Sequence, residues 1–391
     1  MHAPPDMPFQ PGQNLVTQVV DLAFGGEGVA RHEQFVIFIP FVLPGEQVEI
    51  TITEVHKNYA RARALRLLNA SPDRVTPACS YFGACGGCQY QHLRYDRQLE
   101  LKQRQVVELL RRIGHFPDPP VRSPIPCPVP YEYRNRIMVR SQWNGPEQRL
   151  VVGYLRHDNR FVVDVEHCAI AEPALNRQLL EVRRRPPPKG GLKVTLRIPP
   201  ENWEVPPDSF FQNNFHLLPA LVQTVGRSLA DSGVRHLIDA YCGVGFFAIS
   251  LARQIDSFIG IELDKPAIRS ARANAAARAI VNGEFICGAV EDLLPEVVQR
   301  LDPGQTAVLL DPPRRGCLRS GLDTLLAAEP AQILYVSCHP ATLARDLNIL
   351  CRDGVYHLVD LTPLDLFPQT QHVECVADLR RTAARPGFGT I

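Results

Sequence analysis

A cysteine at the junction of an apolar segment and a helix is the first candidate for chemistry in this sequence. Cys338 follows the short apolar run at residues 333–337 and precedes a segment with helical periodicity at 340–347. The amino end of a helix carries a partial positive charge, which lowers the pKa of a nearby thiol. Cys338 is therefore a candidate nucleophile, although an isolated cysteine is more often an inert residue of the core.

A glycine turn predicts a nucleotide-like cofactor. Gly243 opens a Gly-x-Gly turn directly after an apolar run, and Glu262 ends the next run, where an acid accepts hydrogen bonds from ribose hydroxyls. The third glycine of the dinucleotide fingerprint is absent, which favours S-adenosylmethionine over NAD. Asp292 follows a third short run, where it is placed either to meet the adenine or simply to stabilise the start of a helix.

A proline-rich turn follows the fourth apolar run. The sequence Leu-Asp-Pro-Pro-Arg-Arg-Gly at 310–316 forces the chain into an extended exit that presents Asp311 and Arg314. On its own this would be an ordinary turn. Beside a methyl-donor site it is a candidate loop for contacting the substrate.

A group of closely spaced cysteines predicts a metal site. Cys79, Cys85 and Cys88 lie in a short segment with glycines between them, and Cys168 is the best candidate for a fourth ligand. In a long chain without a secretory signal, such spacing favours a metal over disulfides. Zinc and iron-sulfur clusters both accept four thiolates, so the spacing leaves the metal open.

The elements that must position these groups fall into three parts. Apolar runs alternate with helix-compatible segments over residues 205–391, which predicts βαβ units and a doubly wound parallel sheet with its ligands at the carboxyl ends of the strands. Short Val- and Ile-rich runs with Gly and Pro turns over 11–70 predict a small antiparallel barrel. Residues 75–200 form a central α+β part, whose helix at 97–113 is a candidate to pack on the catalytic domain.

Composition narrows the class of protein. The chain has 391 residues, of which 45% are hydrophobic and 21% charged, and a formal net charge of +1. No run is long enough to cross a bilayer and the amino terminus lacks a secretory pattern, so we expect a soluble cytoplasmic protein. Arg61, Arg63 and Arg66 make one local basic segment, either a nucleic-acid contact or a solvated surface.

Taken in order, these motifs resemble one family. The resemblance is to the RNA (uracil-5-)-methyltransferases, which make 5-methyluridine in ribosomal or transfer RNA. The amino-terminal barrel resembles the TRAM domain of many members, so the resemblance covers nearly the whole chain. It is carried by DAYCGVGF at 239–246, LDPPRRG at 310–316, SCHPATLARDL at 337–347, FPQTQHVE at 367–374 and SFFQNN at 209–214.

The resemblance implies a class I methyltransferase domain with a Rossmann-like fold and a covalent mechanism. Carbon 5 of uracil becomes nucleophilic enough to take a methyl group only after a thiolate adds to carbon 6. Cys338 matches the position of this thiol, and Glu374 matches that of the base that removes the carbon 5 proton. We expect Glu374 to be ionised at neutral pH, as a free glutamate is. The methyl-donor pocket would be lined by Gln212, Tyr241, Gly243, Glu262, Asp292 and Asp311, with Asp311 also near the uracil.

The resemblance also implies a metal cofactor and an RNA partner. A subgroup of the family carries the same cysteine pattern with a 4Fe-4S cluster, which favours this cluster over zinc at Cys79, Cys85, Cys88 and Cys168. The target base must be extruded to reach the thiol, with Arg61, Arg63 and Arg314 as candidate substrate contacts. The combination of a cluster with a TRAM barrel favours ribosomal over transfer RNA, and a monomer is the default expectation.

Two rival functions differ in what they require. A methyltransferase acting on a base amino group would use an aromatic residue after the two prolines, where Arg314 stands, and would leave Cys338 without a role. An RNA-binding iron-sulfur protein without catalytic activity would bind RNA whether or not Cys338 is present. Two departures from the family pattern are His339, where many members have Asn, and Phe246, for which no cofactor contact is expected.

Overall fold

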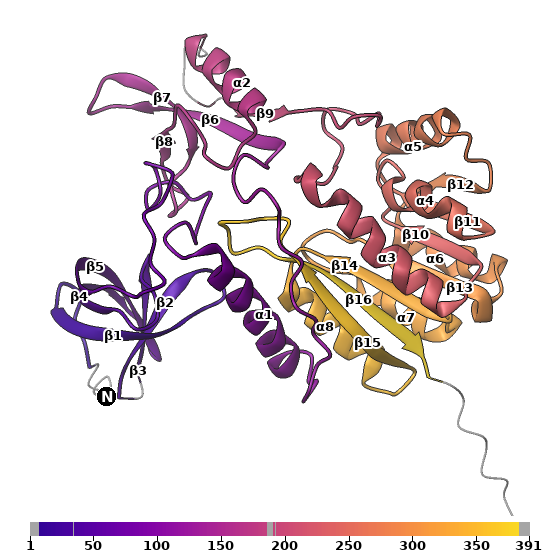
Figure 1. The fold of residues 1–391 in the computed structure, drawn as a ribbon, viewed down its shortest axis with the longest axis horizontal. Helices are drawn as coiled ribbons and strands as arrows, with labels where there is room; N and C mark the ends of the chain where they lie inside the picture. Colours follow the sequence, from indigo (N-terminus) through magenta and orange to yellow (C-terminus); the bar gives the residue numbers. More distant parts are fainter. Residues whose placement is uncertain (1–7, 34, 186–190, 192, 383–391) are drawn as a thin grey trace, which may run out of the picture.

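The computed structural model describes residues 8–33, 35–185, 191 and 193–382. Three parts follow one another along the chain, a barrel, a central part with a small sheet, and a large α/β domain (Figure 1). Among the helices that the structure describes, none is both long and apolar enough to cross a membrane.

The amino-terminal part is a closed five-stranded barrel in which the order is β1-β2-β3-β5-β4. Alternate residues of the strands point inward and form a separate apolar core, which includes Val19, Ile37 and Ile50. The pair β3–β5 is parallel, whereas we expected only antiparallel pairs. An odd number of strands cannot close a ring in which every neighbour is antiparallel, so one parallel pair is required. The strands are β1 (Asn14–Leu22), β2 (Glu27–His32), β3 (Phe35–Pro40), β4 (Gln47–Val55) and β5 (Tyr59–Asn69).

The central part combines an antiparallel sheet, in the order β8-β7-β6-β9, with two helices. One helix, α2, packs on this sheet through Leu175 and Leu179. The other, α1, lies between the barrel and the α/β domain (Figure 1). The elements are α1 (Tyr95–Arg112), β6 (Arg136–Asn144), β7 (Arg149–Leu155), β8 (Val162–Asp164), α2 (Pro173–Arg184) and β9 (Lys193–Arg197).

The carboxyl-terminal domain is built on a seven-stranded sheet in the order β12-β11-β10-β13-β14-β16-β15. The first five strands of this order are parallel, and β16 is antiparallel to both of its neighbours. The predicted α/β architecture is confirmed. The strands are β10 (His236–Ala240), β11 (Ser257–Glu262), β12 (Gly283–Cys287), β13 (Thr306–Leu310), β14 (Gln332–Ser337), β15 (Tyr356–Leu364) and β16 (Glu374–Arg381).

Helices cover both faces of this sheet because successive strand residues point to opposite sides. Leu237 belongs to the apolar core on the side of α3, α4 and α5, and Ile238 belongs to the core on the side of α6, α7 and α8. Helix α1 joins the second core through Val106 and Leu110 and so packs on α8. The helices of this domain are α3 (Leu218–Ser232), α4 (Phe246–Leu251), α5 (Lys265–Ala277), α6 (Val290–Val297), α7 (Arg319–Ala328) and α8 (Pro340–Cys351).

The strand order fixes where a ligand can bind. The chain moves outward from β10 to β11 and β12 and then returns to the other side of β10 to form β13. This reversal is a topological switch point, and open α/β sheets bind ligands in the crevice outside the carboxyl ends of the strands at such a point.

Candidate active site

A cavity of about 760 Å³ lies outside the carboxyl ends of the parallel strands. Its walls combine residues that follow β10, β11, β13 and β14 with the segment at 86–89 and the connection between β15 and β16. The sequence-predicted residues that line this cavity are Gln212, Tyr241, Gly243, Glu262, Asp311, Arg314, Cys338 and Glu374.

The sheet arranges these residues in a row. Glu262 ends β11, Gly243 follows β10, Asp311 follows β13, Cys338 follows β14 and Glu374 begins β16, which is the spatial order of the strands. Neighbouring strands lie roughly 5 Å apart, so the row is long enough for a cofactor and a base side by side. The cofactor candidates lie at one end, the thiol and Glu374 at the other, and Asp311 lies between them.

The turn after β10 has the backbone geometry that only certain residues tolerate. Gly243 and Gly245 have φ angles of 54° and 82°, and Tyr241 has a φ of 69° without being glycine. A Cβ on Gly245 would lie 2.8 Å from atoms of Ile249 and Phe285, whereas a Cβ on Gly243 would meet no atom within 4 Å. Gly243 therefore faces open space in the cavity, and the left-handed Tyr241 marks a strained position of the kind found at functional sites.

Glu262 holds the turn through its side chain. One carboxylate oxygen accepts a hydrogen bond from the backbone N–H of Gly243 at 3.0 Å, and the other accepts from the N–H of Asp264 at 2.8 Å. Tyr241 donates its hydroxyl to Glu291 at 2.9 Å, and Glu291 lines the cavity. Asp292 does not line it and is exposed, because one residue turns a helix by about 100°.

Strand pairing brings Cys338 and Glu374 together. Ser337 at the end of β14 pairs with Cys375 of β16, so the residues flanking this pair, Cys338 and Glu374, meet at the same edge of the sheet. The side-chain amide of Gln212 donates to Asp311 at 3.4 Å and closes the wall between them and the cofactor end.

Burial changes the protonation of all three reactive groups. Burial, together with the charges of Glu374 and Asp311 and against that of Arg314, raises the pKa of Cys338 to about 12. Glu374 is fully buried, and this burial together with Asp311 holds its pKa well above the usual range. Burial, assisted by Glu262, raises the pKa of Asp311 to about 7. Our expectations of a lowered thiol pKa and of an ionised Glu374 are therefore wrong for the protein without substrate.

The start of α8 explains why the helix does not activate the thiol. His339 is the residue that caps this helix, and its ring nitrogen accepts a hydrogen bond from the N–H of Thr342 at 3.3 Å. His339 thus uses the N–H of Thr342, and Pro340 supplies no N–H, so the first turn offers fewer donors to a thiolate. Desolvation of Cys338 then outweighs the helix dipole.

Comparisons with known proteins agree with this geometry. Residues 200–382 match the sequence model of the family described as tRNA (Uracil-5-)-methyltransferase, and residues 8–65 match that of the TRAM domain. An uncharacterized RNA methyltransferase of Nostoc sp. is 33% identical, over 94% of this chain and 96% of the relative. The chain belongs to the RNA (uracil-5-)-methyltransferase family. It is thus an S-adenosylmethionine-dependent methyltransferase that acts on RNA.

Further relatives extend the comparison. An uncharacterized RNA methyltransferase of Thermosynechococcus vestitus is 30% identical over 94% of this chain and 98% of its own length. Among solved structures, the Pyrococcus abyssi tRNA (uracil-54, C5)-methyltransferase in complex with S-adenosyl-L-homocysteine superposes with a TM-score of 0.68 at 24% identity. The match covers 93% of this chain and 100% of that one, so the fold of the family extends over the barrel and the central part.

At the substrate end of the cavity in this methyltransferase, Arg314 contacts a side chain, His372, that we did not predict as a site residue. Arg314 approaches both ring nitrogens of His372 at 2.9 and 3.0 Å. Burial and the cation of Arg314 lower the pKa of His372 to about 3, so the ring is neutral and can accept a hydrogen bond from the guanidinium. His372 lies within the FPQTQHVE motif, two positions before Glu374, and this proximity to a predicted catalytic residue could have identified it from the sequence.

The four predicted metal ligands line a second cavity of about 270 Å³. Burial raises the pKa of Cys85 to about 11 and of Cys88 to about 12, and the neighbouring thiols add to both shifts. Among the described residues, however, no three His, Cys, Asp or Glu side chains are arranged so that they could hold a metal ion. The geometry therefore does not by itself support the predicted metal site. The cysteines in this wall are Cys79, Cys85, Cys88 and Cys168.

The predicted barrel contacts lie apart from the main cavity. Arg61 forms an ion pair with Glu27 and lies over the ring of Phe38, with its guanidinium carbon 5.9 Å from the ring centroid. Arg63 is exposed on β5. Neither lines the main cavity, so their contribution would be to RNA outside the target base.

The central part also contributes residues to the cavity, among them Arg134 of the segment YRNRIMVR at 133–140, which we expected to contact RNA. Gly86, Gly87 and Arg134 line both cavities, so the cysteine-rich segment forms a shared wall. Phe210 is exposed at the rim of the main cavity. Phe246, in contrast, is buried in a cluster with Trp203 and Phe211 and makes no contact with the cavity.

Proposed function

We propose that this protein methylates carbon 5 of a uridine in RNA through a covalent adduct with Cys338. The observation that carries the proposal is the row formed by Glu262, Asp311, Cys338 and Glu374 along one edge of the sheet. This order supports a methyl donor at one end and a uracil between the thiol and Glu374. A function that needs no thiol would leave Cys338 and the buried Glu374 beside it unexplained.

The first step requires a thiolate. Cys338 must lose its proton, and Asp311, whose pKa of about 7 leaves it partly ionised at neutral pH, is the best acceptor in the cavity. The sulfur then adds to carbon 6 of the uracil, and the electron pair of the carbon 5–carbon 6 double bond moves onto the carbon 4 oxygen as an enolate. Arg314 provides the positive charge near this developing anion.

The second half of the reaction returns the ring to aromatic form. S-adenosylmethionine supplies the methyl group, which carbon 5 takes as the sulfonium bond breaks. Glu374 then removes the carbon 5 proton, the double bond re-forms, and the carbon 6–sulfur pair returns to Cys338. A carboxylate with a raised pKa is a stronger base once ionised, so burial suits Glu374 to this step.

We propose that the methyl donor is held at the other end of the row. Its ribose would meet Glu262, and its amino-acid part would meet the turn at Gly243 and the groups around Asp311. Glu291, which lines the cavity, takes the place that we had expected of Asp292. Gln212 and Tyr241 also line the cavity, and Gln212 supplies a side-chain amide donor.

The four cysteines line one cavity, and neighbouring thiols add to the raised pKa of Cys85 and Cys88. We propose that they hold a 4Fe-4S cluster and not a single zinc, because the subgroup that this cysteine pattern resembles carries that cluster. When bound it would supply a cross-link between the segment at 79–88 and Cys168. Reconstitution with iron and sulfide under anaerobic conditions, followed by iron analysis of the protein and of Cys85→Ser, tests this assignment.

We propose ribosomal RNA as the substrate, because the cysteine pattern together with the barrel is typical of that subgroup. Transfer RNA is the second candidate, favoured by the structural similarity to the Pyrococcus abyssi enzyme. We further propose that the protein acts as a monomer divided into a barrel (11–70), a central part (75–200) and a catalytic domain (205–391), since one chain supplies every group named above.

The test is methyl transfer from labelled S-adenosylmethionine to unmodified ribosomal and transfer RNA transcripts, with nucleoside analysis. We expect label in 5-methyluridine from one RNA, loss of this label with Cys338→Ala, and retention with the matched control Cys351→Ala at the far end of α8. Label in another nucleoside, or full activity of Cys338→Ala, would overturn the proposal.

A further inference from the structure

The connection between β15 and β16 forms one wall of the substrate cavity. Phe367, Thr370, Gln371 and His372 in this connection line the cavity, and Glu374 follows two positions after His372. Glu374 is also the first residue of β16 and pairs with Leu364, the last residue of β15. The ladder between the two strands therefore ends at the proposed base, and its position depends on how residues 365–373 are held.

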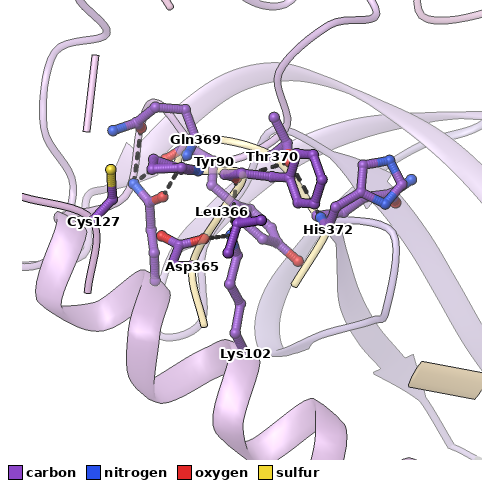
Figure 2. Close-up of polar contacts among 12 residues, drawn as sticks. Tyr90, Lys102, Cys127, Asp365, Leu366, Gln369, Thr370 and His372 are labelled. Atoms are coloured by element: carbon purple, nitrogen blue, oxygen red, sulfur yellow. Dashed lines mark hydrogen bonds and ion pairs between the residues drawn. The ribbon is translucent and has the colours of Figure 1, made fainter. Parts of the chain in front are cut away.

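Helix α1 holds this connection by a buried charge. Lys102 donates its ammonium group to Asp365 at 2.5 Å and to the carbonyl of Phe367 at 3.1 Å (Figure 2). The side chains of Lys102 and Asp365 are both 0% exposed. Lysine is almost never fully buried unless it is paired, and a buried pair contributes little net stability. Such a pair is best explained by the arrangement it enforces.

A second set of contacts lies one helical turn earlier. Gln98 donates to the side-chain oxygen of Gln369 at 2.9 Å and accepts from the N–H of Gln369 at 3.1 Å (Figure 2). The carbonyl of Gln369 accepts from the N–H groups of Gln89 and Tyr90, both at 3.0 Å. Gln369 has a φ of 67°, a conformation that non-glycine residues adopt only when their surroundings enforce it.

We infer that Lys102 and Gln98 are positioning residues that fix the β15–β16 connection, and through it Glu374, for removal of the carbon 5 proton. The proposal rests on the proposed function, in which Glu374 is the base. It assigns to a helix outside the catalytic domain a part in the last chemical step. Cys338 is held by β14 and α8, whereas the hydrogen bonds of Lys102 go to Asp365 and Phe367 of the β15–β16 connection, so adduct formation depends less on this clamp.

The experiment compares Lys102→Met with wild type on two RNAs that differ at carbon 5. Uridine RNA requires removal of the carbon 5 proton. In 5-fluorouridine RNA a fluorine replaces that proton, no base can remove it, and the methylated adduct with Cys338 persists. Turnover on the first RNA thus reports on Glu374, and adduct formation on the second reports only on the earlier steps. The exposed Lys193→Met serves as the matched control.

We expect Lys102→Met to lower kcat on uridine RNA by roughly 10²-fold while the rate of adduct formation falls much less. Affinity for S-adenosylmethionine should stay unchanged, because no residue of α1 is among those that line the cavity. Gln98→Ala, which changes no charge, tests the same prediction if Lys102→Met does not fold. It should also lower turnover on uridine RNA much more than the rate of adduct formation on 5-fluorouridine RNA.

An equal loss of both rates in folded Lys102→Met and Gln98→Ala would reduce the clamp to a general structural role and overturn the inference. Unchanged turnover in either folded variant would also overturn it. Failure of the wild-type protein to form any adduct or 5-methyluridine would instead refute the proposed function, so the two failures are distinguishable.

Discussion

Asp239 gives the sharpest quantitative prediction, because its side chain is fully buried beneath the cofactor turn. One carboxyl oxygen accepts a hydrogen bond from the N–H of Ala248 at 2.9 Å, and the other has no partner in the described structure. Burial raises the pKa of Asp239 to about 8, with smaller contributions from Asp311 and Glu262. At neutral pH the folded protein therefore binds a proton at Asp239 that the unfolded chain has released.

The sign of the effect on stability follows from this difference in bound protons. Because the folded pKa is raised, the unfolding free energy is highest below the ordinary pKa of aspartate and falls as pH rises toward 8. Each pH unit in this window costs about 1.4 kcal/mol, so at pH 7, about three units above the ordinary pKa, the cost is on the order of 4 kcal/mol. Asp239→Asn removes the titration and keeps the side-chain volume and the acceptor for Ala248.

We expect Asp239→Asn to gain stability over wild type at pH 8 and to lose this gain progressively by pH 4. Urea denaturation at several pH values measures the unfolding free energy of both proteins. A gain that is the same at pH 4 and pH 8, or no gain at pH 8, would refute the idea that Asp239 is neutral in the folded protein.

Three further predictions concern the cavity itself. Glu374→Gln should stall the reaction after methyl transfer and lower turnover by about 10²-fold or more, and a covalent RNA complex that survives denaturing electrophoresis would reveal it; release as fast as in wild type would contradict the role of Glu374. Because the pKa of Cys338 is about 12 and that of Asp311 about 7, kcat/KM should rise with pH through neutrality, and a flat profile would contradict proton transfer from the thiol. Gly245→Ala should destabilise the fold, since its Cβ would clash with Phe285, and thermal denaturation would measure this loss. Gly243→Ala should mainly weaken S-adenosylmethionine binding, which calorimetry would measure. Unchanged S-adenosylmethionine affinity of folded Gly243→Ala would show that Gly243 does not face the cofactor.

Much of the fold was predictable because its signals are local. Apolar runs of strand length alternating with helical segments predict an α/β sheet, and the residues after those runs gather at one edge by geometry alone. This is why Cys338, Asp311 and Glu262 could be proposed from sequence. The parallel β3–β5 pair followed from closing a ring of five strands, a constraint that no single strand contains.

The clamp could not be predicted for a physical reason. Gln98, Lys102 and Gln105 recur on one face of α1 and resemble a solvated stripe, yet all three are buried. The partners of Gln98 and Lys102 in the β15–β16 connection lie more than 250 positions away along the chain, and nothing in the local pattern of α1 distinguishes a buried polar contact from a wet surface. Likewise, a one-residue difference at the start of α6 decides that Glu291 and not Asp292 lines the cavity.

We also predicted the protonation of the site wrongly, because burial raises the pKa of its carboxyls. The same burial affects both stability and catalysis. Asp311 raises the pKa of both Asp239 and Glu374, and burial together with Glu262 raises the pKa of Asp311 itself. Because burial and neighbouring charges raise the pKa of these carboxyls, the folded protein without substrate holds protons that the unfolded chain has released, and it loses stability as pH rises. A bound sulfonium would bring a positive charge into this cavity and favour ionisation of the same groups. Binding of the methyl donor should therefore release protons, and calorimetric titration in buffers of different ionisation enthalpy would measure them; proton release that is absent near neutral pH would mean that the carboxyls are already ionised.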